Sequence, residues 1–301
     1  DVSIVDSPDG TITNQVMMIE IPLASIDCVC DCCTSEPTPE PTPTPTTGSV
    51  SGDPHFKTWS GELYDFHGIC DLTLLKNPRF MNGLGMDINV RSKKMHQFSY
   101  VSTAAIRIGS EIFEVAGHKD GDTYWLNGKQ GAGHGSLEEG ASIEGYPITF
   151  RRVHSHKTEY TIHIAKDETI SFGAWKDFVR VDVSGASMNN FHGSLGLMGS
   201  FDKNGIKLGR DGVTVFDDAD KFGIEWQVLE SEAILFHEAG GPQHPAMCEI
   251  PTKTALRRRL AESTITLEEA ELACSRVNPE DFDLCTFDIM ATNDIDVAGA
   301  Y

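Results

Sequence analysis

The sequence predicts a mainly β protein, in which an antiparallel, sandwich-like domain is followed by a small helical appendage tied by disulfides. Three observations indicate this fold class. Apolar and polar residues alternate along several short segments between residues 50 and 228, as in strands with one buried face. Glycine-containing turns separate these segments at short intervals. After residue 228 the alternation gives way to helical spacing.

Within residues 50–228 the alternation is clearest in four segments: 106–115, 148–153, 158–164 and 179–183. Pairs such as Asn127-Gly128 and Asp120-Gly121 suit tight connections between antiparallel strands. No helix-length period interrupts this part of the chain, which argues against a parallel sheet with crossover helices.

The C-terminal extension, residues 229–301, is expected to be mostly helical. Residues 231–239 and 252–260 have helical spacing. Thr266 and Glu269 form a capping box that opens a helix through about Val277, where Asn278-Pro279 stops it.

The N-terminal arm, residues 1–33, ends in four cysteines: Cys28, Cys30, Cys32 and Cys33. Adjacent cysteines hardly bridge each other without strain, so their partners are expected in residues 1–27, in the C-terminal tail or on a second copy of the chain. A thiolate metal cluster is the alternative. The linker that follows, residues 34–49, alternates proline and threonine and is expected to be an extended spacer that could carry O-glycans.

Charge and cysteine usage limit the partners and the compartment. With 24 Lys+Arg against 45 Asp+Glu, the formal charge is −21, which disfavours nucleic acid and anionic membranes. No apolar run is long enough to span a bilayer. The even number of cysteines, eight, fits an oxidising, extracellular compartment, where the four separated ones, Cys70, Cys248, Cys274 and Cys285, are expected to form disulfides. The chain has no basic-then-apolar leader before Asp1, which suits a processed mature chain and a fragment equally.

Three motifs resemble those of a known family. Residues 52–70 read GDPHFKTWSGELYDFHGIC, residues 196–205 read GLMGSFDKNG, and residues 222–226 read FGIEW. In this order and spacing they resemble the opening, the glycine-rich loop and the closing strand of a von Willebrand factor type D domain. The resemblance implies an extracellular antiparallel β module, here residues 50–228, that serves assembly and adhesion without catalytic turnover.

The resemblance also implies particular cysteine pairs. Cys70 would pair with Cys248, which leaves Cys274 and Cys285 to form a local clip. The family usually has a further bridge between a cysteine just before GDPHF and one in the glycine-rich loop. This chain has residues 48–51 and Met198 at those places, so both partners of that bridge are missing together.

The resemblance implies a calcium site that this chain retains only in part. Ser60 and Ser200 stand where the family has stronger oxygen ligands. The remaining candidates are Asp202, Asn204 and Asp211, since carboxylate and amide oxygens of a glycine-rich loop suit Ca²⁺. The alternative is an ordinary turn in which Asp and Asn satisfy their own backbone.

The Asp53-Pro54 bond is a second candidate for chemistry. Some family members cleave themselves at this bond, where the aspartate carboxyl attacks its own carbonyl and forms a cyclic anhydride. The alternative is a rigid strand start in which Pro54 fixes φ. No motif of an enzyme with an external substrate is present.

The sequence therefore predicts a secreted structural or adhesive protein that forms a homopolymer, filament or matrix with copies of itself or with other extracellular proteins. The alternatives are a monomeric calcium-binding interaction module and a self-cleaving precursor.

Overall fold

The computed structural model describes residues 46–95, 98–131, 136–154, 157–238, 248–251 and 263–301. All of them belong to one of the two units into which the chain divides, Thr44–Tyr301. Three parts named above lie outside the described residues: the arm with Cys28, Cys30, Cys32 and Cys33, most of the linker, and the segment 252–260.

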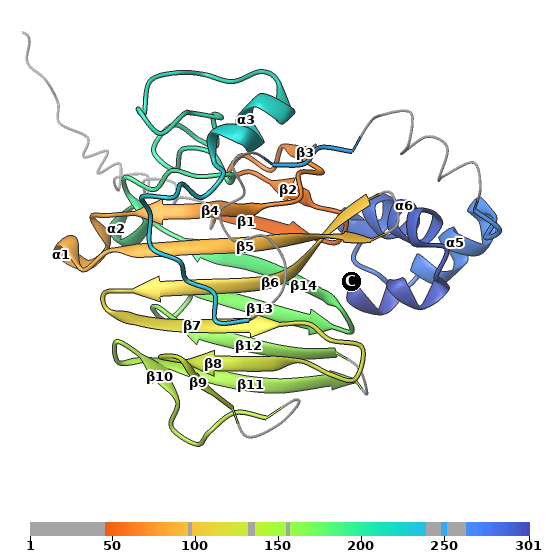
Figure 1. Ribbon diagram of the computed structural model, residues 1–301, viewed down its shortest axis with the longest axis horizontal. Helices are drawn as coiled ribbons and strands as arrows, with labels where there is room; N and C mark the ends of the chain where they lie inside the picture. The colour runs from red at the N-terminus through yellow and green to blue at the C-terminus, as the bar shows by residue number, and fades with distance from the viewer. Residues whose placement is uncertain (1–45, 96–97, 132–135, 155–156, 239–247, 252–262) are drawn as a thin grey trace, which may run out of the picture. The chain divides into compact units, whose positions relative to one another are not determined.

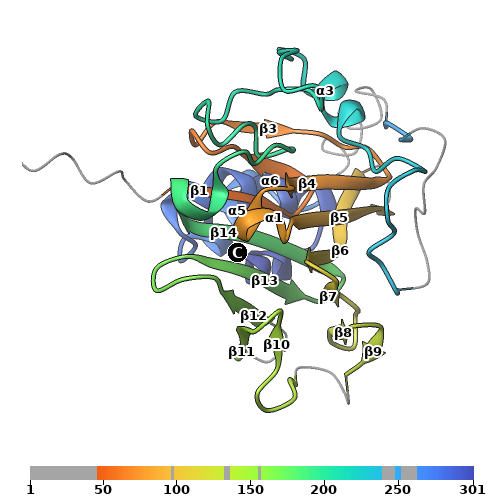
Figure 2. The same cartoon turned by 90° about the vertical axis from the view of Figure 1, so that its left-hand side faces the viewer.

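Two antiparallel sheets form the body of this unit and face each other as layers (Figures 1 and 2). The larger sheet has the order β10-β11-β12-β13-β14-β1-β2-β3, and the smaller has the order β4-β5-β6-β7-β8-β9. The prediction of a mainly β, antiparallel sandwich is confirmed. The strands are β1 (Thr46–Ser51), β2 (His55–Lys57), β3 (Leu63–Asp65), β4 (Asp71–Asn77), β5 (Met86–Met95), β6 (Phe98–Ile108), β7 (Glu111–Ala116), β8 (Thr123–Leu126), β9 (Lys129–Gln130), β10 (Ser142–Ile143), β11 (Tyr146–His154), β12 (Lys157–His163), β13 (Thr169–Trp175) and β14 (Phe178–Ala186).

The core between the sheets follows from the alternation of the sequence. In β12, Thr158, Tyr160 and Ile162 are buried, while the residues between them are partly exposed, because successive side chains of a strand point to opposite faces. Phe113 of β7 contacts Tyr160 and Phe172 from the opposite sheet, with ring centroids 5.7 and 5.9 Å apart. These aromatic contacts join the two layers.

One strand prediction is corrected by the structure. The run 106–115 does not form one strand: β6 ends at Ile108 and β7 begins at Glu111. Gly109 has a φ of +56°, which a glycine adopts at little cost, and this allows the chain to reverse between the two strands.

Two further expectations are wrong. Residues 222–226 do not form a closing strand but lie at the end of helix α3 (Ala219–Glu225). Asp218 caps this helix by accepting a hydrogen bond from the Lys221 amide, and Phe222 and Trp226, one helical turn apart, are both buried. Residues 231–238 are not helical. Two of them, Leu235 and Phe236, instead pack on the outer face of β6 and β7.

The expected C-terminal helix is present and slightly shorter than predicted. Helix α5 (Leu267–Cys274) opens with the Thr266–Glu269 capping box. It is followed by the short helix η1 (Pro279–Asp281), α6 (Phe282–Thr292) and η2 (Ile295–Ala300). Figure 1 shows these helices at one end of the sheets, where they pack against Trp175 and Phe178 at the β13–β14 turn. Two short helical turns, α1 (Phe80–Gly83) and α2 (Met188–Phe191), lie elsewhere on the unit.

The disulfides Cys70–Cys248 and Cys274–Cys285 are both present, as the resemblance implied. The first closes a loop of 178 residues and the second a loop of 11. In the chain-entropy model the longer loop is worth about 5 kcal/mol and the shorter about 3 kcal/mol.

We therefore expect the double substitution Cys70→Ser/Cys248→Ser to lower the free energy of unfolding by about 2 kcal/mol more than Cys274→Ser/Cys285→Ser. Urea denaturation of the two double variants measures the difference. The opposite order would contradict the assignment of Cys70–Cys248 as the main covalent constraint of this unit.

Candidate functional site at the Asp53–Pro54 bond

The Asp53–Pro54 bond lies in the turn between β1 and β2. These strands pair in antiparallel register, with Ser51 opposite His55, so residues 52–54 close the turn. Gly52 has a φ of +57°, and the Asp53 side chain is buried although turns are usually solvated. The turn is buried because the C-terminal helices cover it.

The two oxygens of the Asp53 carboxyl group differ in their surroundings. Oδ1 lies 2.8 Å from Nδ1 of His67. Oδ2 is buried and has no hydrogen-bond partner among the described residues. Asp53 lines a cavity of about 10 Å³ together with Ser99, Phe178 and Asp288. Such a cavity holds at most about one water molecule, so this carboxyl is almost dry.

His55, which follows the bond, is held between two carboxylates. Its Nδ1 lies 2.6 Å from Oδ1 of Asp65 on the paired strand β3, and its Nε2 lies 3.2 Å from Oδ1 of Asp288 on α6. Both ring nitrogens therefore act as donors, which requires a protonated imidazole.

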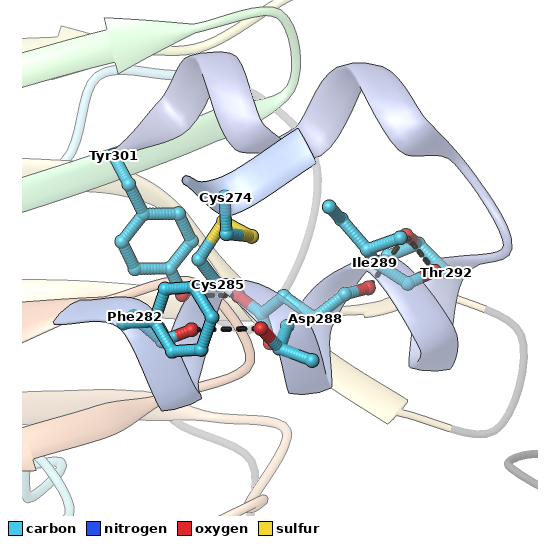
Figure 3. The surroundings of a disulfide bond; sticks show 8 residues. Cys274, Phe282, Cys285, Asp288, Ile289, Thr292 and Tyr301 are labelled. Carbon is cyan, nitrogen blue, oxygen red and sulfur yellow. Dashed lines mark hydrogen bonds between the residues drawn. A yellow bond between two sulfur atoms is a disulfide. The ribbon is translucent and has the colours of Figure 1, made fainter. Parts of the chain in front are cut away.

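Asp288 completes the site from a distant part of the chain. Its Oδ2 accepts hydrogen bonds from the Asp53 amide, at 3.3 Å, and from the Tyr301 hydroxyl, at 2.5 Å. Figure 3 shows the Tyr301 hydroxyl directed toward Asp288 beside the Cys274–Cys285 disulfide. A Cβ at position 52 would lie 1.9 Å from Asp288 Oδ2, so Gly52 is required for this approach.

Burial and neighbouring charges change the pKa values of these groups. Burial raises the pKa of Asp53 to about 6; His67 acts in the opposite direction, and the charge of Asp288 adds to the increase. Burial alone would lower the pKa of His55, but Asp288 and Asp65 outweigh it and raise that pKa to about 10. The site thus holds a protonated histidine beside a carboxyl group that ionises only near neutral pH.

The candidate calcium ligands lie elsewhere. Asn204 lines a polar surface pocket together with Ser60, and a Cβ at Gly205 would lie 2.6 Å from the Ser60 amide. The segment around Ser60 and the glycine-rich loop are therefore in contact, as in the implied site. A Lys207–Glu62 ion pair also joins these two segments.

The two candidate carboxylates make hydrogen bonds within or near their own loops. Asp202 accepts from the Gly193 amide and lies 2.9 Å from the His192 ring. Asp211 accepts from Thr214 and from the Val213 amide, which hold its pKa at about 2. In the part of the chain that the structure describes, no group of three or more His, Cys, Asp or Glu side chains could hold a metal ion. This arrangement does not fit a calcium cage, and calcium binding stays a prediction from the sequence.

The positions of the missing family bridge are in contact. A Cβ at Gly48 would lie 2.7 Å from the sulfur of Met198, whose side chain is buried. Packing joins β1 to the glycine-rich loop where the resemblance implied a disulfide.

Sequence reasoning identified Asp53 and Pro54 but missed Asp65, His67, Asp288 and Tyr301. Asp65 and His67 lie two residues apart within the opening motif, so the sequence pattern could have indicated them. For Asp288 the only signal is a carboxylate inside the apolar run FDIMA at residues 287–291.

The comparisons with known proteins agree with this fold. The family model of the von Willebrand factor type D domain matches residues 48–206, slightly more than half of the chain. The match includes most of β1 and the Asp53–Pro54 turn, and it ends before α3. No curated protein matches the chain.

The ion pairs of His55 predict a pH dependence of stability. Because folding raises the pKa of His55 from 6.5 to about 10, the stabilisation is complete below pH 6.5 and is lost as the pH rises through about 10. The difference in free energy of unfolding between the wild type and His55→Gln should therefore be largest near about pH 6 and shrink steadily toward about pH 10. Urea denaturation across this range measures it. A difference that grows with pH would contradict the charged state of His55.

Proposed function

The chain belongs to the von Willebrand factor type D domain family, and from this premise we propose that it is a secreted structural protein that assembles covalently through its cysteine-rich arm. Domains of this family occur in extracellular adhesive and assembly proteins and form a non-enzymatic family. The family match over the disulfide-bonded β unit is the observation that carries the proposal. No described helix is both long and apolar enough to cross a bilayer.

The way in which the linker joins the sheet suits a structural protein that bears tension. The last four residues of the predicted linker, residues 46–49, already belong to β1, which pairs with β14 on one side and β2 on the other. A pull on the arm would therefore act on an interior strand, where hydrogen bonds on both sides share the force. An edge strand would be a weaker anchor because it has only one neighbour.

The arm and linker supply the reach and the reactive groups. A proline-rich linker of this composition extends by about 3.1 Å per residue, so residues 36–45, which precede β1, would span about 31 Å. Disulfides formed by Cys28, Cys30, Cys32 or Cys33 with a second copy would then produce the homopolymer, filament or matrix. The linker threonines are the proposed sites of O-glycans.

Covalent assembly predicts a ladder of oligomers on non-reducing electrophoresis that collapses to monomer on reduction. Replacing all four arm cysteines by serine should abolish the ladder. The Cys274→Ser/Cys285→Ser variant is the control, because it loses a disulfide within the unit and keeps the arm. A monomer under both conditions for the wild type would refute covalent assembly.

A second function is favoured by one observation: the almost dry carboxyl group of Asp53, whose Oδ2 has no hydrogen-bond partner among the described residues and whose pKa is raised to about 6. We propose that the chain cleaves itself at Asp53–Pro54. A carboxyl oxygen attacks the Asp53 carbonyl carbon, the bond to the Pro54 nitrogen breaks, and the carboxyl proton passes to that nitrogen. The products are a cyclic anhydride at residue 53 and a free proline amine. Water then opens the anhydride to two carboxyl groups.

Self-cleavage should be faster in the folded protein near about pH 6 than in protein denatured with urea at the same pH, where Asp53 has its ordinary pKa. Reducing electrophoresis and mass spectrometry would detect a fragment beginning with Pro54, and Asp53→Asn should abolish it. Equal rates in folded and denatured protein would show that the buried site contributes nothing.

The remaining alternative, a monomeric calcium-binding module, has less support. Asp202 and Asp211 are both engaged in hydrogen bonds, and the Glu62 carboxylate beside the contact between the two segments is paired with Lys207.

A further inference from the structure

The C-terminal helical segment, residues 263–301, reaches the Asp53–Pro54 turn through one side chain. Asp288 lies 235 residues from Asp53 in the sequence, yet its carboxylate is buried against the turn. The family match ends at residue 206, so this contact comes from a part of the chain outside the matched region.

The carboxylate of Asp288 contacts the residues on both sides of the bond. Its Oδ2 accepts from the amide of Asp53, before the bond, and its Oδ1 pairs with Nε2 of His55, after the bond. One rigid group of three atoms therefore fixes the main chain on one side and an imidazole on the other. This arrangement restricts the conformations in which the Asp53 side chain meets its own carbonyl.

Asp288 is itself held firmly. Tyr301 donates a hydrogen bond to Oδ2, and helix α6 is tied to α5 by the Cys274–Cys285 disulfide (Figure 3). Phe287, the preceding residue, contacts His55 and Phe98 edge to face. The chain leaves no side chain at Gly52, which makes room for the carboxylate.

We propose that Asp288 is a positioning residue for cleavage of the Asp53–Pro54 bond, and that the disulfide-tied C-terminal segment is the element that brings it there. The proposal rests on the self-cleavage proposed above and adds the part of the chain that governs it. Asp288 does not react. It acts through Asp53 and His55, which it holds in place.

Asp288 also affects the proton that the reaction needs. Among the described residues, the titratable groups that act on Asp53 are His67 from the loop after β3, His55 from β2 and Asp288 from α6. Asp65 and Tyr301 contact these groups from behind, and Tyr100 lines the same small cavity. Among these, the negative charge of Asp288 raises the pKa of Asp53. The carboxyl group thus keeps its proton, which must pass to the Pro54 nitrogen, at a higher pH than it otherwise would.

The test compares Asp288→Asn with Asp283→Asn in the full chain. Asparagine keeps the shape of the side chain and an oxygen that can accept from the Asp53 amide, but removes the charge. Asp283 is an exposed residue of the same helix and serves as the matched control. Cleavage is followed over time from about pH 5 to pH 8 by reducing electrophoresis, and circular dichroism confirms that each variant is folded.

We expect Asp288→Asn to cleave about tenfold more slowly or worse near pH 6, because positioning effects of this size are common. We also expect the midpoint of its pH profile to move to lower pH. The pKa of Asp53 falls when the negative charge of Asp288 is removed, while His55 still has Asp65 as a partner. A purely structural role would lower the rate without moving the midpoint. Asp283→Asn should match the wild type.

The outcomes separate the two proposals. If the wild type stays intact at every pH, self-cleavage is wrong and the role of Asp288 is wrong with it. If the wild type is cleaved and Asp288→Asn behaves like Asp283→Asn, only the role of Asp288 is overturned. Should Asp288→Asn fail to fold, Tyr301→Phe removes one hydrogen bond to Asp288 and should slow cleavage in the same direction; an unchanged rate and midpoint would overturn the proposal.

Discussion

The pairing of β1 with two strands at once is the constraint on which the rest of the structure depends. Val50 of β1 lies opposite Val181 of β14 and opposite Phe56 of β2. This one short strand therefore joins strands β10–β14, from later in the sequence, to strands β2 and β3, from its beginning. This pairing fixes the turn at residues 52–54 and aims it at the C-terminal helices. It also fixes where the linker leaves the sheet. Both proposed functions follow from that position: the arm is anchored there, and the Asp53–Pro54 bond is buried there.

Much of the fold could be predicted because the larger sheet has one buried face along most of its length. Three of the four alternating segments lie almost wholly within β11, β12 and β14. The errors arose where two structures share one pattern. A run that alternates through a turn, as at Gly109, has the pattern of a single strand. The spacing of Phe222 and Trp226 suits a helix as well as a strand, and only the helix cap at Asp218 distinguishes the two. The apolar residues Leu235 and Phe236 pack on the outer face of a sheet, and their helix-like spacing gives no sign of this contact.

The site could be predicted only where its residues are close in the sequence. Asp53 and Pro54 stand in a recognisable motif, and His67 lies 14 residues further on. Asp288 could not be predicted, because its role depends on how a separate helical segment docks on the turn. The same limit applies to Tyr301. Burial also changes the pKa values of these groups. A turn sequence gives no sign of this, because turns usually lie at the surface.

The contact of Gly48 with Met198 has a consequence for a cleaved molecule. All four cysteines paired in the described residues follow Pro54, so neither of these disulfides would join residues 1–53 to the remainder after the bond breaks. Among the described residues, the strand hydrogen bonds and packing of β1 and the contacts of Gly52 and Asp53 with Val101, His67 and Asp288 would then retain the arm. The two fragments would then be held together without a covalent bond. A sustained pull could separate them, and so could a denaturant without any reducing agent. If the chain cleaves itself as proposed, the absence of the family bridge at Gly48 and Met198 would give the attachment of the arm a finite lifetime.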